Sequence, residues 1–360
     1  MIRVLVVEDS PTMVALLRRA IDSQPDLQVV GVADNGRAAV ELARRLRPDI
    51  ITMDVEMPRM DGLAAIREIM STDPIPIVVI SAHATGAEAQ QGIIAMNEGA
   101  VAVLAKPENV LGDGLDGYAR NLARTLRTYS EVRLVRRRRR SAPVVADTPA
   151  SGAASRTRTV TGGVCEVVAL GVSTGGPETI KRILESLPAS FDVPVAVTIH
   201  MAEDFLPGFA GWLDKAVGRP VALAANRESL RRGRVYVAPG GTHLILERRA
   251  NGELAWRLDN GPPVGGFRPS VTPFLASVAV ACGPRAVGGI LTGMGRDGAD
   301  GLLALHQAGG QTFVQDEATS VIFGMPAAAL KVGAASLAVP LDRIAGHLGA
   351  AARRAGNAPK

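Results

Sequence analysis

Short apolar runs alternate with amphipathic stretches over the first third of the chain. The apolar runs are Val4–Val7, Leu27–Val32, Ile50–Met53, Ile77–Ile80 and Val101–Leu104. Continuous apolar runs of this length are typical of parallel strands that are buried on both faces. Stretches with helical spacing of apolar residues, such as Val14–Ile21 and Ala38–Leu46, lie between them. This alternation predicts an N-terminal doubly wound α/β domain with a five-stranded parallel sheet.

The last two hundred or so residues also alternate in the manner of an α/β domain. The expected strands are Val167–Leu170, Val195–Ile199, Val235–Ala238, Leu244–Leu246 and Ala286–Leu291. The expected helices are Thr179–Leu187, Phe209–Val217, Val271–Ala281 and Gly301–Ala308. A hairpin is expected around Pro239-Gly240-Gly241, so this second sheet is not expected to be wholly parallel.

Charge marks a boundary between the two α/β segments. Residues 1–120 carry 11 Lys and Arg against 17 Asp and Glu, whereas residues 121–163 carry 10 against 2. The basic segment holds Arg136–Arg140 and continues into a stretch rich in Ser, Thr, Ala, Gly and Pro, which is typical of a flexible linker. We therefore expect domains at 1–125 and 164–355, joined by a linker at 126–163. A contact of the arginine run with nucleic acid or an acidic membrane is the less favoured interpretation.

Composition excludes several classes of protein. Two cysteines, Cys165 and Cys282, cannot build a disulfide framework or a zinc cluster. No apolar run approaches the ~18–20 residues that cross a bilayer, and Glu8-Asp9 end the first apolar run too early for a signal peptide. We expect a cytoplasmic protein without membrane insertion.

Three carboxylates are expected at the carboxyl ends of two strands in the first domain. Glu8 and Asp9 follow the first strand, and Asp54 ends the third. Ligands of an open parallel sheet bind beyond these strand ends, so the three side chains should lie close together. A cation would offset their repulsion, and oxygen ligands of this kind suit Mg²⁺, which also bridges phosphate oxygens. The pattern predicts a Mg²⁺ site at which Asp54 attacks phosphorus.

Two further polar residues end the fourth and fifth strands. Ser81 is placed to hydrogen-bond a phosphoryl oxygen, and Lys106 is placed to pair with its charge. Either residue alone has a simpler explanation, but both fall at the same sheet edge as the carboxylates. The full set indicates a phosphoryl-accepting site.

Residues 1–125 resemble the receiver domain of two-component response regulators, most specifically in the segment MDVEMPRMDG that contains Asp54. The resemblance implies that Asp54 is the phosphoacceptor and that a histidine kinase supplies the phosphoryl group. The chain departs from the pattern at Val103, where receivers usually carry an aromatic switch residue. We therefore expect phosphorylation to be read out mainly through Ser81 and the loop after it.

Ser173 lies in a glycine-rich turn, GVSTGGP, between a predicted strand and a predicted helix. A serine in such a turn is exposed at the edge of the sheet, where the backbone N–H of Thr174 and the helix N-terminus can face a developing oxyanion. We interpret Ser173 as a nucleophile. A tight turn or a phosphate cradle explains this motif equally well when it is taken alone.

A general base and a carboxylate are needed to activate such a serine. His200 follows the predicted strand Val195–Ile199 and so shares a sheet edge with Ser173. Asp297 follows another predicted strand, in the segment TGMGRDG, and can orient the imidazole. The chain order Ser, His, Asp differs from the Ser, Asp/Glu, His order of α/β-hydrolases, so an ordinary α/β-hydrolase is not expected.

The segments GVSTGGP, TGMGRDG and QDEATSVIFGMP together resemble the catalytic domain of the chemotaxis receptor methylesterase CheB. With the receiver and the linker, the resemblance covers nearly the whole chain. It implies that Ser173, with His200 as base, removes methyl esters from glutamates of methyl-accepting chemoreceptors, releasing methanol, and deamidates some glutamines. Thr174 and Met294 are expected to support the oxyanion, and no metal is expected for this step.

The chain departs from the common family pattern next to the expected site. The segment Met201–Phe209, which follows His200, is longer than usual. Phe267 stands where many members have His, and Thr272 stands where many have Asp. These departures concern the receptor partner rather than the triad.

Two other functions remain open from the sequence. The second domain would bind without catalysis in one of them, with nucleic acid held by Arg136–Arg140, and would hydrolyse a small-molecule ester in the other. No helix-turn-helix pattern with a basic recognition helix follows residue 164, and residues 164–360 carry a net charge of only +3. We therefore expect no nucleic-acid partner.

Overall fold

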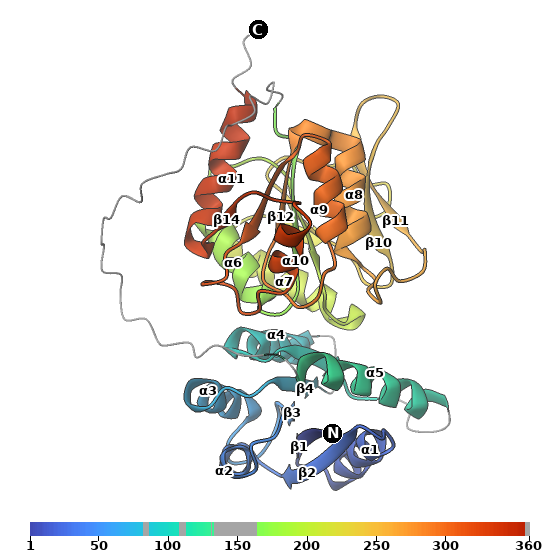
Figure 1. The fold of residues 1–360 in the computed structure, drawn as a ribbon, viewed down its shortest axis with the longest axis vertical. Coiled ribbons are helices and arrows are strands. Elements are labelled where there is room, and N and C mark those ends of the chain that lie inside the picture. Colours follow the sequence, from blue (N-terminus) through green and yellow to red (C-terminus); the bar gives the residue numbers. More distant parts are fainter. Residues whose placement is uncertain (82–85, 108–112, 131, 133–163, 357–360) are drawn as a thin grey trace, which may run out of the picture.

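The computed structural model describes residues 1–81, 86–107, 113–130, 132 and 164–356. Two lobes stack end to end, and each is built on a parallel sheet (Figure 1). We call residues 1–132 the N-terminal lobe and residues 164–356 the C-terminal lobe. Most of the predicted linker, including Arg136–Arg140, and the loop after Ser81 lie outside the described residues. None of the described helices combines the length and the apolar character needed to cross a membrane.

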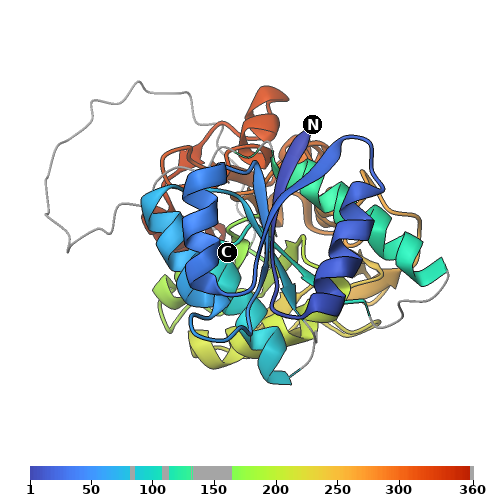
Figure 2. The same cartoon turned by 90° about the horizontal axis from the view of Figure 1, so that it is seen from below.

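The N-terminal lobe has five parallel strands in the order β2-β1-β3-β4-β5. The strands are β1 (Ile2–Val7), β2 (Leu27–Ala33), β3 (Ile50–Asp54), β4 (Ile77–Ser81) and β5 (Ala102–Ala105). One face is covered by α1 (Pro11–Asp22) and α5 (Asp113–Ser130), and the other by α2 (Gly36–Leu46), α3 (Gly62–Thr72) and α4 (Gly86–Glu98) (Figure 2). The predicted doubly wound α/β fold is confirmed.

Polar caps fix where three of these helices begin. The Ser10 side chain accepts from the N–H of Met13 and precedes Pro11, which favours the first helical position of α1. Asn35 and Asp61 cap α2 and α3 in the same way. Since each helix begins just beyond a strand end, the loops that carry the acidic residues are short and closely defined.

The C-terminal lobe has seven parallel strands in the order β14-β13-β12-β6-β7-β9-β8. They are β6 (Val167–Val172), β7 (Val195–Ile199), β8 (Val221–Leu223), β9 (Val235–Val237), β12 (Ala286–Ile290), β13 (Gln311–Gln315) and β14 (Ala338–Val339). The helices are α6 (Gly176–Ser186), α7 (Leu206–Val217), α8 (Val271–Cys282), α9 (Ala299–Gln307), α10 (Met325–Lys331) and α11 (Leu341–Gly356), with the short 3₁₀ helices η1 (Glu203–Phe205) and η2 (Gly283–Arg285). β6 lies between β7 and β12, where the strand order reverses.

The prediction of a hairpin around Pro239-Gly240-Gly241 is wrong. β9 pairs only in parallel, with β7 and β8, and the main sheet is wholly parallel. The antiparallel pair consists of β10 (His243–Arg248) and β11 (Leu254–Asp259), which form a separate two-stranded sheet. The chain leaves the main sheet because β10 finds its apolar partners on β11 and α8. Leu246 lies opposite the buried Trp256, whose ring packs near that of Phe274.

At the interface, each lobe inserts an apolar side chain into the core of the other. α4 of the N-terminal lobe lies against α6 and α7 (Figure 1). Phe205, at the end of η1, packs into the core of the N-terminal lobe, and Ile93 of α4 packs into the core of the C-terminal lobe. Gly92 allows the close approach, because a Cβ there would lie 3.1 Å both from the Phe205 ring and from Val103. The lobes are therefore joined by interpenetrating cores.

Candidate functional site

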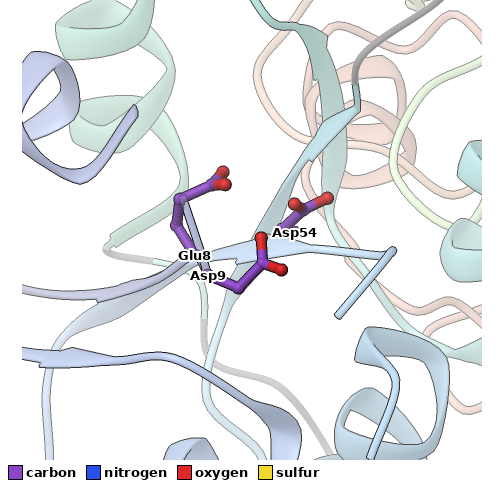
Figure 3. A group of neighbouring side chains, drawn as sticks. All are labelled: Glu8, Asp9 and Asp54. Carbon is purple, nitrogen blue, oxygen red and sulfur yellow. The ribbon is translucent and has the colours of Figure 1, made fainter. Parts of the chain in front are cut away.

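The predicted acidic cluster forms at the carboxyl ends of β1 and β3. Figure 3 shows the side chains of Glu8, Asp9 and Asp54 gathered at this edge. One carboxylate oxygen from each residue lies within 4.8 Å of those from the other two. β1 and β3 are neighbours at the point where the strand order reverses, which is the usual ligand crevice of such a sheet. Three convergent carboxylates form a donor set that fits Mg²⁺.

Lys106 completes this edge of the sheet. Its Nζ lies 2.7 Å from Asp54 Oδ2 and 2.9 Å from Glu8 Oε2. Burial opposes the charge of Lys106, but hydrogen bonds to Asp54 and Glu8 outweigh it and raise the pKa of the amine. Burial also raises the pKa of Glu8, and the hydrogen bond from Lys106 opposes that rise. Ser81 is buried at the end of β4, and a cavity of about 190 Å³ lies among Ser81, Lys106 and the acids.

The register of the main sheet brings Ser173 and His200 to one edge. Val172 of β6 pairs with Ile199 of β7, and the next residues along these two strands are Ser173 and His200. Asp297 reaches the same edge from the loop that follows β12, and its Oδ2 lies 2.7 Å from Nε2 of His200. Ser173 and Asp297 are buried.

Two glycines make the turn around Ser173 possible. Gly175, the N-cap of α6, has a φ of 78°, a left-handed conformation that favours glycine. A Cβ on Gly293 would lie 2.7 Å from Ser173 Cβ, so only glycine permits this approach. Thr174 is buried at the start of the turn, and Met294 directly follows Gly293. Both residues expected to support the oxyanion thus lie in segments that border Ser173.

The Asp297 carboxylate accepts hydrogen bonds from one short segment at the start of α8. Oδ1 accepts from Ser270 Oγ and Thr272 Oγ1, each at 2.7 Å, and Oδ2 accepts from the N–H of Val271 at 2.8 Å. Burial opposes the charge of Asp297, but the hydrogen bonds from His200, Ser270 and Thr272 outweigh it and hold the pKa well below its ordinary value. Sequence reasoning missed this role of Ser270 and Thr272.

These contacts assign the two nitrogens of His200. Since a carboxylate can only accept, Nε2 is the donor to Asp297, and Nδ1 of the neutral ring is left as the acceptor. Nδ1 is buried and has no hydrogen-bond partner among the described residues. Hydrogen bonds between a nucleophile and its base are often long in free enzymes and shorten when substrate binds. Nδ1 is therefore the nitrogen of the neutral ring that is left free to accept a proton.

Two family models match the chain. One describes CheB methylesterase and matches residues 168–348, and the other describes the response regulator receiver domain and matches residues 4–111. The chain belongs to the CheB methylesterase family and carries a receiver domain in its N-terminal lobe. We refer to that lobe as the receiver below.

Curated relatives match over nearly their full length. A protein-glutamate methylesterase/protein-glutamine glutaminase 1 from Syntrophus aciditrophicus is 43% identical, and the match covers 96% of this chain and 97% of the relative. A protein-glutamate methylesterase/protein-glutamine glutaminase 4 from Myxococcus xanthus is also 43% identical, and the match covers 99% and 98%. The crystal structure of the Thermotoga maritima CheB methylesterase catalytic domain is 34% identical, with a TM-score of 0.49, over 51% of this chain and 96% of that chain.

Replacing Thr272 by valine tests the network around Asp297. The Thr272→Val variant keeps the shape of the side chain but loses the donor to Asp297 and the acceptor for the N–H of Gly298. We expect the free energy of unfolding at pH 7 to fall by about 1–3 kcal/mol, the cost of breaking a buried hydrogen bond to a charged group. Both tryptophans, Trp212 and Trp256, lie in the C-terminal lobe, so urea unfolding followed by tryptophan fluorescence reports this lobe.

The pH dependence of this stability loss shows whether it comes from the charged form of Asp297. Because the folded-state pKa of Asp297 is depressed, its contribution to stability is present above its ordinary pKa of 3.8 and is lost as the pH falls through the lower folded-state value. The difference in the free energy of unfolding between wild type and Thr272→Val should therefore decrease below about pH 4. The free energy of unfolding of Thr272→Ser should stay close to that of wild type. A difference in the free energy of unfolding that increases at acidic pH would contradict a stabilising role of the charged Asp297.

Proposed function

We propose that this chain is a protein-glutamate methylesterase and protein-glutamine glutaminase whose activity is controlled by phosphorylation of Asp54. The observation that carries the proposal is the convergence of Ser173, His200 and Asp297 at one edge of the main sheet, with Nε2 of His200 2.7 Å from Asp297. The proposed substrates are methyl esters and amides on glutamyl and glutaminyl side chains of a chemoreceptor. We also propose a histidine kinase of the same pathway as the phosphoryl source and the cytoplasm as the location.

The reaction proceeds by acyl transfer. Nδ1 of His200 takes the proton of Ser173 Oγ as this oxygen attacks the ester carbonyl, and Asp297 stabilises the imidazolium that forms. The tetrahedral intermediate collapses when the imidazolium returns the proton to the leaving oxygen, which departs as methanol. Water then attacks the acyl-serine by the same route and releases the glutamate. A glutamine substrate loses ammonia in place of methanol.

The proposed oxyanion donors are backbone groups. The N–H of Thr174 lies in the turn that leads into α6, whose N-terminus favours negative charge. We propose the N–H of Met294 as the second donor, since the preceding residue, Gly293, lies directly against Ser173. Donors that are fixed by the backbone stabilise the developing oxyanion without reorganising during the reaction.

The receiver site supports phosphorylation at Asp54. Glu8, Asp9 and Asp54 would hold Mg²⁺, which supplies charge neutralisation between the carboxylates and an incoming phosphate. Lys106, already paired with Asp54, is placed to hold an oxygen of the transferred group, and Ser81 is placed to hydrogen-bond another.

We propose that the chain divides into a receiver domain at 1–125, a linker at 126–163 and a catalytic domain at 164–355.

Contacts of α5 with the catalytic lobe support control by occlusion. Tyr129, near the end of α5, lies near the catalytic turn: burial raises the pKa of its phenol, and the side chains of Thr174 and Ser173 moderate the rise. Arg124, one and a half turns earlier on α5, donates to the carbonyl of Gly266 at 3.5 Å. We infer from these contacts that in this conformation the receiver hinders access of a receptor segment to Ser173.

Substitution of the triad tests the proposed chemistry. Ser173→Ala and His200→Ala should abolish methanol release from methyl-labelled receptor membranes, because they remove the nucleophile and its base. Asp297→Asn should retain more activity than either, since an imidazole that is poorly oriented can still act. All three variants should still be phosphorylated at Asp54, because that site is built on the other sheet.

The same assay distinguishes other functions. Full activity of Ser173→Ala would overturn the triad. Hydrolysis of small esters without any methanol release from receptors would indicate a small-molecule esterase, and no hydrolysis of either kind would indicate a receiver with a binding domain.

Removal of divalent cations tests the acidic cluster. Phosphorylation by acetyl phosphate should require Mg²⁺ or Mn²⁺ and stop in EDTA, because the negative charge of Glu8, Asp9 and Asp54 would repel the incoming phosphate. The basal esterase activity of the same sample should not change in EDTA, since the triad contains no metal ligand set among the described residues. Phosphorylation at an equal rate in EDTA would exclude the proposed role of the cluster.

Truncation of Tyr129 tests occlusion. Tyr129→Ala should raise methanol release by the unphosphorylated protein about three- to tenfold, because losing one buried contact worth about 1 kcal/mol shifts the closed–open equilibrium by a factor of this size. Arg120→Ala, at an exposed position on the same helix, is the control and should leave basal activity unchanged. A basal rate that falls in Tyr129→Ala would mean that α5 assists the reaction rather than blocking it.

A further inference from the structure

We propose that Phe267 is a positioning residue for His200 and holds the imidazole in the plane from which Nδ1 can reach Ser173. The phenyl and imidazole rings are stacked, with centroids 3.7 Å apart and planes inclined by 1°. The inference rests on the triad proposed above and adds a residue to it. Phe267 packs on the ring of His200 and carries no proton donor or acceptor, so its effect on the reaction passes through His200.

The imidazole needs a second restraint because its hydrogen bond to Asp297 constrains the ring plane only weakly. That bond is made at Nε2, which lies close to the axis about which the ring turns, and the side-chain torsion that sets this turn is intrinsically broad. Nδ1 has no hydrogen-bond partner among the described residues that would stop the rotation. A parallel ring in contact with one face of His200 supplies the missing restraint.

The chemistry of a phenyl ring suits this position. Phe267 has no donor or acceptor, so it leaves both nitrogens of His200 to Asp297 and Ser173. The face of a phenyl ring also attracts a cation, which favours the imidazolium that forms when Ser173 is deprotonated. Phe267 can therefore hold the ring without competing for the proton.

The backbone that carries Phe267 is tightly defined. Val264 and Phe267 exchange two backbone hydrogen bonds of 3.1 Å across a two-residue turn. The turn residues, Gly265 and Gly266, have φ values of 60° and 86°, as a type I′ turn requires. The turn itself is exposed, whereas Phe267 is partly buried against His200. A short and rigid turn can present a ring at a fixed height over the imidazole.

Phe267→Leu tests the proposal in the full-length protein, because leucine keeps an apolar side chain of similar size but has no flat face. We expect kcat for methanol release to fall about three- to tenfold with KM within about twofold of wild type, since the substitution weakens only the positioning of the base. Labelling of Ser173 by a small fluorophosphonate, which needs the base but no receptor, should slow by the same factor. Phe267→Tyr, which keeps the ring, should restore both rates.

Controls separate this role from folding and from the triad itself. Val264→Ala truncates the other end of the same turn, where the side chain is 40% exposed, and should match wild type. Wild-type kcat and labelling in Phe267→Leu, or an equal loss in Phe267→Tyr or in Val264→Ala, would overturn the proposal. Ser173→Ala should abolish labelling. If it does so while Phe267→Leu behaves as wild type, the triad stands and only the positioning role fails.

Discussion

The buried carboxylate of Asp297 organises the edge of the main sheet at which Ser173 and His200 lie. A charge that is removed from water must be met by donors, and Asp297 meets four of them from the start of α8 and a fifth on His200. Satisfying this one charge fixes the position of α8 against the loop after β12. It also fixes which nitrogen of His200 is left without a hydrogen-bond partner among the described residues. The packing of the lobe and the chemistry of the site are therefore consequences of the same set of hydrogen bonds.

His200 and the interface between the lobes belong to one short segment of the chain. His200 directly follows β7, and Phe205, which packs into the receiver core, follows after only four intervening residues. Of these, Met201 and Ala202 also pack against that core. Gly92 lies close to both Phe205 and Val103, because a Cβ on Gly92 would be 3.1 Å from each of these side chains. The receiver and His200 are thus connected by a short segment whose side chains pack against the receiver core.

Sequence reasoning worked where burial alone decides the structure. The apolar runs of β3, β6 and β7 are buried along their whole length, and the ends of these strands locate Asp54, Ser173 and His200. Sequence reasoning failed where a strand is defined by the strand it pairs with. β11 and β13 mix polar with apolar residues, so no apolar run marks them. The antiparallel hairpin joins β10 and β11 and does not lie at Pro239-Gly240-Gly241.

The same limit applies to the site. Ser173, His200 and Asp297 follow from strand ends, whereas the roles of Ser270, Thr272 and Phe267 depend on how α8 and one exposed turn pack. The position of Tyr129 depends on how two lobes dock. No periodicity or local motif in the sequence carries that information.

The interpenetrating cores have a consequence for the evolution of this protein. Phe205, with Met201 and Ala202 beside it, completes a core that is mostly encoded by the N-terminal residues, and Ile93 contributes in the same way to the C-terminal core. A recombination event that joined this receiver to a different output domain would leave a phenyl-sized hole in one partner and an exposed aromatic ring on the other. Exchange of either half would therefore lower the stability of both cores, although each half has the architecture of a module that could be exchanged.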